Sequence, residues 1–270
     1  MNSIVVRRKI SDNEFIELEP EELSLRIYPK LIELHNNNPI DSYLSPDKLF
    51  ILIDLDIQVA YLDNICTHYQ TTEEFYHAVY KHHPIDTNII DKSKIIITGW
   101  IHKEAYFLEP DLQYYLQQEL PLTQITYKNN PLSLEDIYKD MIQDINNDAD
   151  INKNIDNVLK RIENFLSISM TDKHSLINEC QKLKQNSSIT PKQKRQLIEV
   201  ILKIVKAKPY WEDKIIIQDD YLSEDEARDN IIANIARFYA KSCDLSEQSH
   251  SIVYHIPQWV KYLHSISASS

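Results

Sequence analysis

Three short runs of apolar residues stand out along the chain and predict strands that are buried on both faces. They lie within Leu49–Asp56, Lys94–Gly99 and Lys214–Asp220, and each run ends in polar residues. Continuous apolar runs rich in β-branched side chains are typical of strands in a parallel sheet. The first run could instead form a helix capped by Ser45-Pro46-Asp47. Its β-branched and aromatic content favours the strand.

Between these runs, apolar residues recur at the three- and four-residue spacing of amphipathic helices. The clearest helix begins at Thr190-Pro191, a capping residue followed by a proline at the first helical position. Further helices are predicted over residues 21–36, 102–119, 132–146, 153–168 and 172–185, from Thr71 to Pro84, and from Ser223 to about Lys241, with short strands over 3–7, 15–18, 125–127 and 251–254. Because strands alternate with helices, we predict an α/β fold with a Rossmann-like parallel sheet and helices on both faces.

Composition narrows the possible chemistry. The chain has one glycine, Gly99, among 270 residues, whereas average usage of roughly 7% would give about nineteen. This scarcity excludes the glycine-rich turns of dinucleotide-binding folds, phosphate-binding loops, nucleophile elbows and EF-hands. Any phosphate chemistry must therefore use side chains or non-glycine backbone.

The net charge of the chain indicates which classes of partner it could bind. The formal net charge is −12, so the chain gains little from neutralising phosphates and we expect no nucleic-acid partner. A divalent cation or a protein partner remains compatible with this charge. The abundance of Ile, Asn and Lys is typical of an AT-rich bacterial or phage genome.

The beginning of the chain has no apolar segment typical of a signal peptide, and no apolar run approaches the length of a membrane-spanning helix. Three widely spaced cysteines, Cys66, Cys180 and Cys243, form no CxxC pair and are interpreted as reduced thiols. We therefore expect a cytoplasmic protein without a membrane partner, although an export signal read by a receptor would be invisible to this reasoning. His68 lies two residues after Cys66, but a catalytic thiol needs a histidine placed by the fold, so Cys66 is interpreted as a buried or half-buried thiol.

Polar side chains come directly after each of the three predicted central strands. They are Asp54 and Asp56 after the first, Thr98 after the second, and Asp219 and Asp220 at the end of the third. If the three strands lie side by side, these groups meet at the carboxyl edge of the sheet, where ligands bind in open α/β folds. Four carboxylates at one edge repel one another and need a cation, and their oxygen ligands suit Mg²⁺.

Two basic residues could balance a phosphate at this edge. Lys192 and Lys194 lie in the first turn of the helix that precedes the third strand, where the helix dipole also favours an anion.

The order of these segments resembles the haloacid dehalogenase-like (HAD) hydrolase superfamily. Ile51–Asp56 looks like the strand that ends in the family's Asp-x-Asp motif, and Ile95–Gly99 looks like its second motif, a strand ending in Thr or Ser. Lys192, or alternatively Lys194, matches the lysine of the third motif. Ile215–Asp220 looks like the acidic fourth motif. The matches are short islands within the span from the first motif to the fourth.

The resemblance implies a Mg²⁺-dependent phosphatase that acts on a phosphorylated substrate through an aspartyl-phosphate. Asp54 would be the nucleophile, and Asp56 would protonate the leaving group and later activate water. Thr98 would bind a phosphoryl oxygen, and Lys192 would hold Asp54 and neutralise phosphate charge. The implied metal ligands are Asp54, Asp56, Asp219 and Asp220. The long segment between the second and third motifs would hold an inserted, mainly helical cap over 128–188, which leaves 1–127 and 189–270 as the core.

Two departures from the family pattern keep other functions open. Ile57-Gln58 stands where the family usually has a small residue and a hydroxyl residue after Asp-x-Asp, and Gln218 stands where the fourth motif often has glycine. These departures favour the alternative of a catalytically degenerate HAD-like or helical protein that binds another protein. A third alternative is a glycosyltransferase that uses Asp54 and Asp56 to hold a metal-bound sugar nucleotide.

Overall fold

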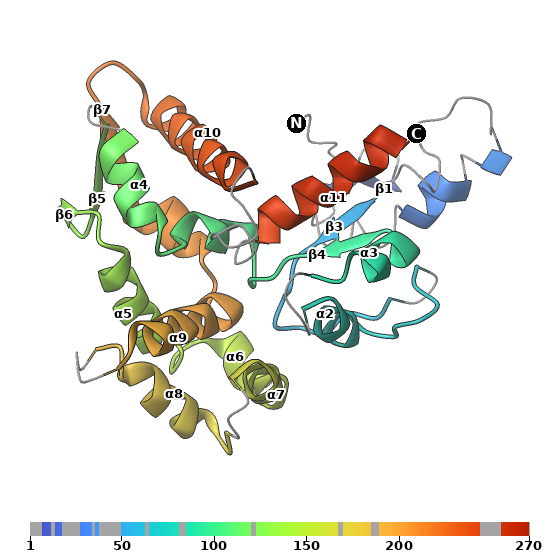
Figure 1. Cartoon of the computed structure of the whole chain (residues 1–270), viewed down its shortest axis with the longest axis horizontal. Coiled ribbons are helices and arrows are strands. Elements are labelled where there is room, and N and C mark those ends of the chain that lie inside the picture. Colours follow the sequence, from blue (N-terminus) through green and yellow to red (C-terminus); the bar gives the residue numbers. More distant parts are fainter. Residues whose placement is uncertain are drawn as a thin grey trace. The chain divides into compact units, whose positions relative to one another are not determined.

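The computed structural model describes residues 7–11, 14–17, 28–33, 36–37, 50–62, 65–80, 85–119, 123–166, 170–184, 189–243 and 255–269. The chain divides into two compact units (Figure 1). The first comprises Met1–Asp54 and Val59–Thr98, and the second comprises Leu55–Gln58 and Gly99–Ser270. Within the described part, no helix is both long enough and apolar enough to cross a bilayer.

A parallel pair of strands lies in the first unit (Figure 1). Strand β3 (Ile51–Ile53) pairs with β4 (Ile95–Ile97), with Ile51 opposite Ile95 and Ile53 opposite Ile97. Both strands confirm the sequence prediction, including the choice of strand over helix for the first run. The chain crosses from one strand to the other through helices α2 (Thr72–Tyr80) and α3 (Thr87–Ser93), because parallel strands cannot be joined by a hairpin.

The two crossover helices form for reasons that are local to the sequence. Helix α2 begins at the predicted position and places two carboxylates in its first turn, where they complement the helix dipole. Helix α3 is capped by Asp86, whose side chain accepts a hydrogen bond from the Asn88 N–H. It ends at Lys94, which has a left-handed backbone (φ 57°) and leads directly into β4.

An antiparallel strand pair, β1 (Arg7–Ser11) with β2 (Glu14–Glu17), also belongs to the first unit. The strand predicted over 15–18 is thus confirmed through residue 17. Residues 28–33 are helical, within the helix predicted over 21–36. The predicted positions 3–6 and 21–27 lie outside the described residues.

The second unit contains a three-stranded antiparallel sheet instead of a continuation of the parallel one. Its strand order is β6 (Asn130–Pro131), β5 (Thr123–Tyr127), β7 (Ile215–Asp219). The third predicted central strand, β7, therefore exists, but it pairs antiparallel with β5 instead of parallel with β3 or β4. The prediction of one parallel sheet was wrong for this strand, because an apolar β-branched run is compatible with either pairing.

Helices make up most of the rest of the second unit (Figure 1). They are the 3₁₀ helix η1 (Lys103–Leu108), α4 (Leu112–Glu119), α5 (Leu134–Asp144), α6 (Ala149–Lys153), α7 (Ile155–Leu166), α8 (Lys173–Gln181), α9 (Pro191–Ile204), the π-helical turn η2 (Tyr210–Lys214), α10 (Glu224–Cys243) and α11 (His255–Ser269). Helices α8 and α9 contact each other, and both contact α5 and α7. Helix α10 contacts α4, β7 and α11. The fold is mixed α/β and predominantly helical.

Most of the predicted helices are present with shifted bounds. The helix predicted over 102–119 is divided into η1 and α4, with Pro110 between them. Helix α9 begins at Pro191 under a Thr190 cap, as predicted, and Gln193 completes the capping box. Helix α11 was not predicted, and the strand predicted over 251–254 lies outside the described residues. The insertion predicted over 128–188 contains α5 to α8, and its separation from a core stays a prediction.

Candidate active site

Two of the residues in the predicted site lie at the carboxyl ends of paired strands. Asp54 follows Ile53, and Thr98 follows Ile97, which is the ladder partner of Ile53. The Thr98 N–H continues this ladder by donating to the Ile53 carbonyl oxygen at 3.0 Å. Residues that follow paired positions of adjacent parallel strands lie at the same edge of the sheet. The strand pairing thus brings Asp54 and Thr98 to one edge, with Thr98 buried and Asp54 half-buried.

The alignment of this edge is held at both ends of the strand pair. The Ile51 N–H donates to the Lys94 carbonyl oxygen at 2.9 Å, at the opposite end from the Thr98 contact. The Tyr80 hydroxyl, at the end of α2, donates to the Ile97 carbonyl oxygen at 2.5 Å. These contacts fix the register, and a slip of one residue would turn Thr98 to the other face.

Asp56 belongs to the second unit and is anchored there by Arg161 of α7. The guanidinium of Arg161 donates to the Asp56 carbonyl oxygen at 2.7 Å and to the Lys203 carbonyl oxygen at 3.1 Å. Arg161 is buried, so these carbonyl groups replace part of the water around its charge. Ile57, which departs from the family pattern, is fully buried. Its side chain is part of the core, which explains why an apolar residue stands there.

A histidine that the sequence analysis did not single out lies near Asp56. The Nδ1 atom of His102 is buried and has no hydrogen-bond partner among the described residues. Burial lowers the pKa of His102, an effect that the carboxylates of Asp56 and Glu104 partly oppose. Burial thus favours the uncharged form of this imidazole. No sequence pattern marked this residue, because its surroundings come from segments far apart in the chain.

The two candidate lysines both lie in the first turn of α9. Lys192 is exposed, whereas Lys194 is half-buried and forms an ion pair with Glu135 of α5 at 2.8 Å. That ion pair gives Lys194 a structural partner, which leaves Lys192 as the better candidate for a ligand contact. Both lysines belong to the second unit and Asp54 to the first, so the predicted contact between Lys192 and Asp54 stays a prediction.

The acidic end of β7 lies in the antiparallel sheet. Asp219 pairs with Thr123 of β5, and its Oδ1 atom accepts a hydrogen bond from the Tyr221 N–H at 2.9 Å. Asp220 is exposed. The predicted meeting of these carboxylates with Asp54 depended on a single parallel sheet, which the strand pairing of the described residues does not contain.

The implied Mg²⁺ was tested against the chemistry of the available ligands. In the described part of the chain, no group of three or more His, Cys, Asp or Glu side chains is placed to hold a metal ion. The carboxylates of the implied ligand set are divided between the two units, with Asp54 in the first. Mg²⁺ binding remains a prediction from the resemblance.

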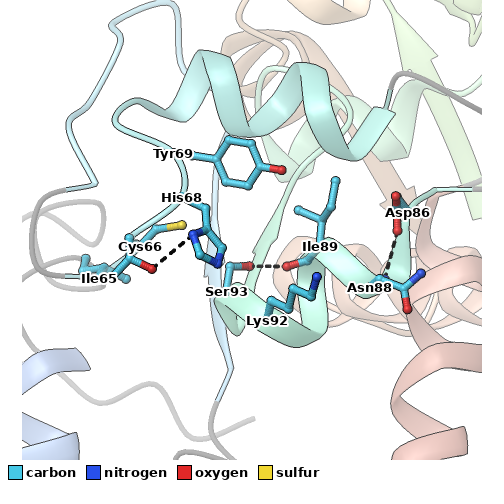
Figure 2. A pocket seen from close by; sticks show the side chains of 10 residues that line it. Ile65, Cys66, His68, Tyr69, Asp86, Asn88, Ile89, Lys92 and Ser93 are labelled. Atoms are coloured by element: carbon cyan, nitrogen blue, oxygen red, sulfur yellow. Dashed lines mark hydrogen bonds between the residues drawn. The ribbon is translucent and has the colours of Figure 1, made fainter.

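The described residues form a cavity in each unit. One, of about 480 Å³, lies in the first unit between residues 65–69 and α3, with Cys66, His68 and Lys92 in its walls (Figure 2). The other, of about 360 Å³, lies in the second unit and includes Glu135 and Lys194 in its lining. Cys66 is half-buried, as predicted. In the sequence, the feature that could have indicated the first cavity was the run of thiol, hydroxyl, imidazole and phenol side chains over residues 66–69.

Comparison with known proteins found no relative of this chain. The chain matches no family model, and no curated protein or solved structure matches it.

Proposed function

We propose that the chain is an aspartate-dependent phosphohydrolase of the HAD-like type. In this proposal, the carboxyl edge of the β3–β4 pair carries the catalytic residues of a Rossmann-like core. One observation carries this proposal. Asp54 and Thr98 follow directly paired positions of two adjacent parallel strands, joined by the Thr98 N–H contact to the Ile53 carbonyl oxygen at 3.0 Å. A carboxylate and a hydroxyl at the carboxyl end of parallel strands are the groups that the resemblance requires at that edge.

In the proposed reaction, a carboxylate oxygen of Asp54 attacks the phosphorus of a phosphate monoester. The bond from phosphorus to the ester oxygen breaks, and an aspartyl-phosphate forms. The hydroxyl of Thr98 donates a hydrogen bond to a phosphoryl oxygen and so stabilises charge that grows in the transition state. Water then attacks the aspartyl-phosphate, which releases inorganic phosphate and restores the Asp54 carboxylate.

The proton transfers are assigned to Asp56, and Lys192 is assigned the balance of phosphate charge. Both assignments come from the resemblance. The first is supported because Asp56 lies two residues after Asp54 and Arg161 holds its backbone carbonyl oxygen at 2.7 Å. The second is supported because Lys192 is exposed and has no role in the ion pair that occupies Lys194.

Hydrolysis of an aryl phosphate by the full chain tests the proposal, with Mg²⁺ added in one series and a chelator in the other. Asp54→Asn removes the nucleophile and should lower kcat about 10³-fold or more. Thr98→Val keeps the shape of the side chain but removes one donor to the phosphoryl group, which should lower kcat about 10²-fold. Intact mass after an acid quench should show a phosphate adduct in the wild type but not in Asp54→Asn.

The matched control is Asp91→Asn. Asp91 is a carboxylate of the same unit, exposed on α3 and paired with Lys94 at 2.7 Å, and its substitution should leave kcat unchanged. Circular dichroism verifies that each variant is folded. Turnover that persists in Asp54→Asn would sink the proposal, as would a folded wild type that hydrolyses no aryl phosphate in either series.

A second candidate function, binding of a protein partner by a catalytically degenerate chain, is favoured by the position of β7. This strand ends in Asp219 within the antiparallel sheet, and the next turn exposes Asp220 and Tyr221. An exposed aromatic residue beside carboxylates suits a protein contact. If the wild type is inactive but folded, loss of capture of a cellular protein by Tyr221→Ala would support this candidate.

A further inference from the structure

The first unit contains a cavity whose walls do not belong to the proposed catalytic edge. It measures about 480 Å³, within the range typical of sites for small molecules. Figure 2 shows Cys66, His68 and Tyr69 on the loop that precedes α2, facing Lys92 and other residues of α3. All of the lining residues belong to the first unit.

Backbone contacts hold the loop wall of this cavity in place. The Cys66 N–H donates to the Leu62 carbonyl oxygen at 3.1 Å, and the Leu62 N–H donates to the Gln70 carbonyl oxygen at 2.9 Å. Leu62 is fully buried. The ring of Tyr69 packs edge-on against Phe75 of α2, with 5.5 Å between ring centres. The backbone N–H of Cys66 is therefore held by a buried residue of the same unit, and a ligand would meet a prepared wall.

One lysine in the opposite wall can pair with an anionic ligand. The one carboxylate of the lining, Asp86, caps α3 by accepting the Asn88 N–H at 3.0 Å. Lys92 has no hydrogen bond or ion pair within the described part of the chain, whereas the neighbouring Lys94 is paired with Asp91. A ligand carboxylate could thus pair with Lys92 without displacing an existing partner.

The thiol in this cavity differs from the other described cysteine. Cys180 lies in the core, and burial raises its pKa to about 12, so it stays protonated at neutral pH. Cys66 is half-buried and lines an open cavity. Access to the thiol controls thiol–disulfide exchange, so Cys66 can meet a reagent from solvent and Cys180 cannot.

We propose that this cavity binds a small disulfide that carries carboxylate groups and that Cys66 forms a mixed disulfide with it. The Cys66 sulfur attacks one sulfur of the ligand, the sulfur–sulfur bond of the ligand breaks, and a bond between the Cys66 sulfur and the ligand forms. The other half of the ligand leaves as a thiol and takes up the proton that Cys66 releases. No net oxidant is needed, because the ligand disulfide is reduced as the mixed disulfide forms. This proposal is independent of the phosphohydrolase.

The test measures the rate of adduct formation by intact mass on the reduced full chain. Three probes of different charge are used: oxidised glutathione, which is anionic, hydroxyethyl disulfide, which is neutral, and cystamine, which is cationic. The adduct should form on the wild type and on Cys180→Ser, with peptide mapping placing it at Cys66, and it should form more slowly on Cys66→Ser. Lys92→Gln should slow the reaction with oxidised glutathione roughly threefold to tenfold and leave the reaction with hydroxyethyl disulfide unchanged.

The control for charge is Lys103→Gln, since Lys103 is an exposed lysine of the second unit. Its rates should equal those of the wild type with all three probes. An adduct that forms equally on Cys66→Ser would overturn the proposal. So would an equal ratio of the anionic and neutral rates in the wild type and in Lys92→Gln, a readout that does not depend on the cysteine variants.

Discussion

Strands β4 and β7 both contain the tripeptide Ile-Ile-Ile, at Ile95–Ile97 and Ile215–Ile217, yet they occupy different kinds of sheet. In β4 all three side chains are buried, and the strand pairs parallel with β3. In β7 the first and third are buried, but the middle residue, Ile216, is 39% exposed, and the strand pairs antiparallel with β5. Identical residues thus form a strand covered on both faces in one case and on one face in the other.

The two strands also differ in the path of the chain after each of them. Beyond β4 the chain stays buried through Thr98, Trp100 and Ile101. Beyond β7 it turns into solvent, and Tyr221 is 85% exposed. Helix α3 leads directly into β4, and the parallel pairing of β3 with β4 depends on the crossover that contains this helix. The comparison teaches that the apolar run determines that a strand forms, while the segments that pack around it determine its partner and its exposed face.

The largest expected effect is that the folded chain loses stability as pH rises, because of a buried carboxyl group in the segment after β4. There the Trp100 indole N–H donates to Glu109 at 2.8 Å, and Arg195 pairs with the same carboxylate at 2.7 Å. Burial nevertheless raises the pKa of Glu109 from 4.5 to about 7. Between these values the folded chain keeps a proton that the unfolded chain has released, so the free energy of unfolding falls as pH rises. The difference corresponds to about 3 kcal/mol.

Urea unfolding at several pH values between about 5 and 8 measures this effect. Glu109→Gln removes the titrating group and should flatten the pH dependence by about 3 kcal/mol over this range. Glu212→Gln, at a more exposed carboxylate of the same unit, should leave the slope as it is. Parallel slopes for the wild type and Glu109→Gln would show that Arg195 keeps the carboxylate ionised throughout.

A smaller loss is expected when a methyl group is added just after β4. A Cβ atom at Gly99 would lie 1.9 Å from the Nδ1 and Cε1 atoms of His255. The ring would have to move and give up its 3.1 Å contact with the Tyr106 hydroxyl. Gly99→Ala should therefore cost about 2 kcal/mol of unfolding free energy. Gln218→Ala, near the end of β7, should cost less than about 0.5 kcal/mol because that side chain is exposed.

A double-mutant cycle makes the cause of the Gly99 effect testable. In the His255→Ala background the ring is absent, so adding the Gly99→Ala change should cost little. An unchanged cost in that background would mean that the strain lies in the backbone and not in the contact with the imidazole ring.

The smallest expected effect compares the two middle isoleucines directly. Ile96→Thr places a hydroxyl group in a buried position, with 6% of the residue exposed, and should cost about 1.5 kcal/mol. Ile216→Thr keeps the branched shape at a half-exposed position and should change stability by less than about 0.5 kcal/mol. Chemical denaturation of both variants checks the difference. Equal costs would remove the contrast between the two strands.

The sequence predicted elements well where the signal was local. The apolar runs became β3, β4 and β7, and the Thr190 cap with Pro191 began α9 at the expected residue. The prediction failed where it needed contacts between distant segments. It placed the third run in a parallel sheet, and it did not anticipate α11 or the pairing of β5 with β7.

The candidate site was predictable to the same extent. The edge that holds Asp54 and Thr98 follows from two strand runs and a helical crossover, all of which can be read locally. The position of Asp219 depended on the partner of β7, and no local pattern specified that partner. The sequence did not mark His102 because its neighbour Asp56 lies far away in the chain. The cavity beside Cys66 could not be predicted either, because its facing wall comes from α3.

The amino-acid sequence by itself determined that the three apolar runs form strands, where the best-capped helix begins, and that glycine-rich ligand loops are absent. These properties follow from apolar periodicity, capping and backbone freedom, which act over a few residues. Only the tertiary structure decided the partner, direction and exposed face of each strand. An isoleucine gains the same transfer free energy from any apolar cover, and its backbone groups are satisfied by a parallel or an antiparallel neighbour. The different pairing of β4 and β7 was therefore determined by the packing of distant parts of the chain.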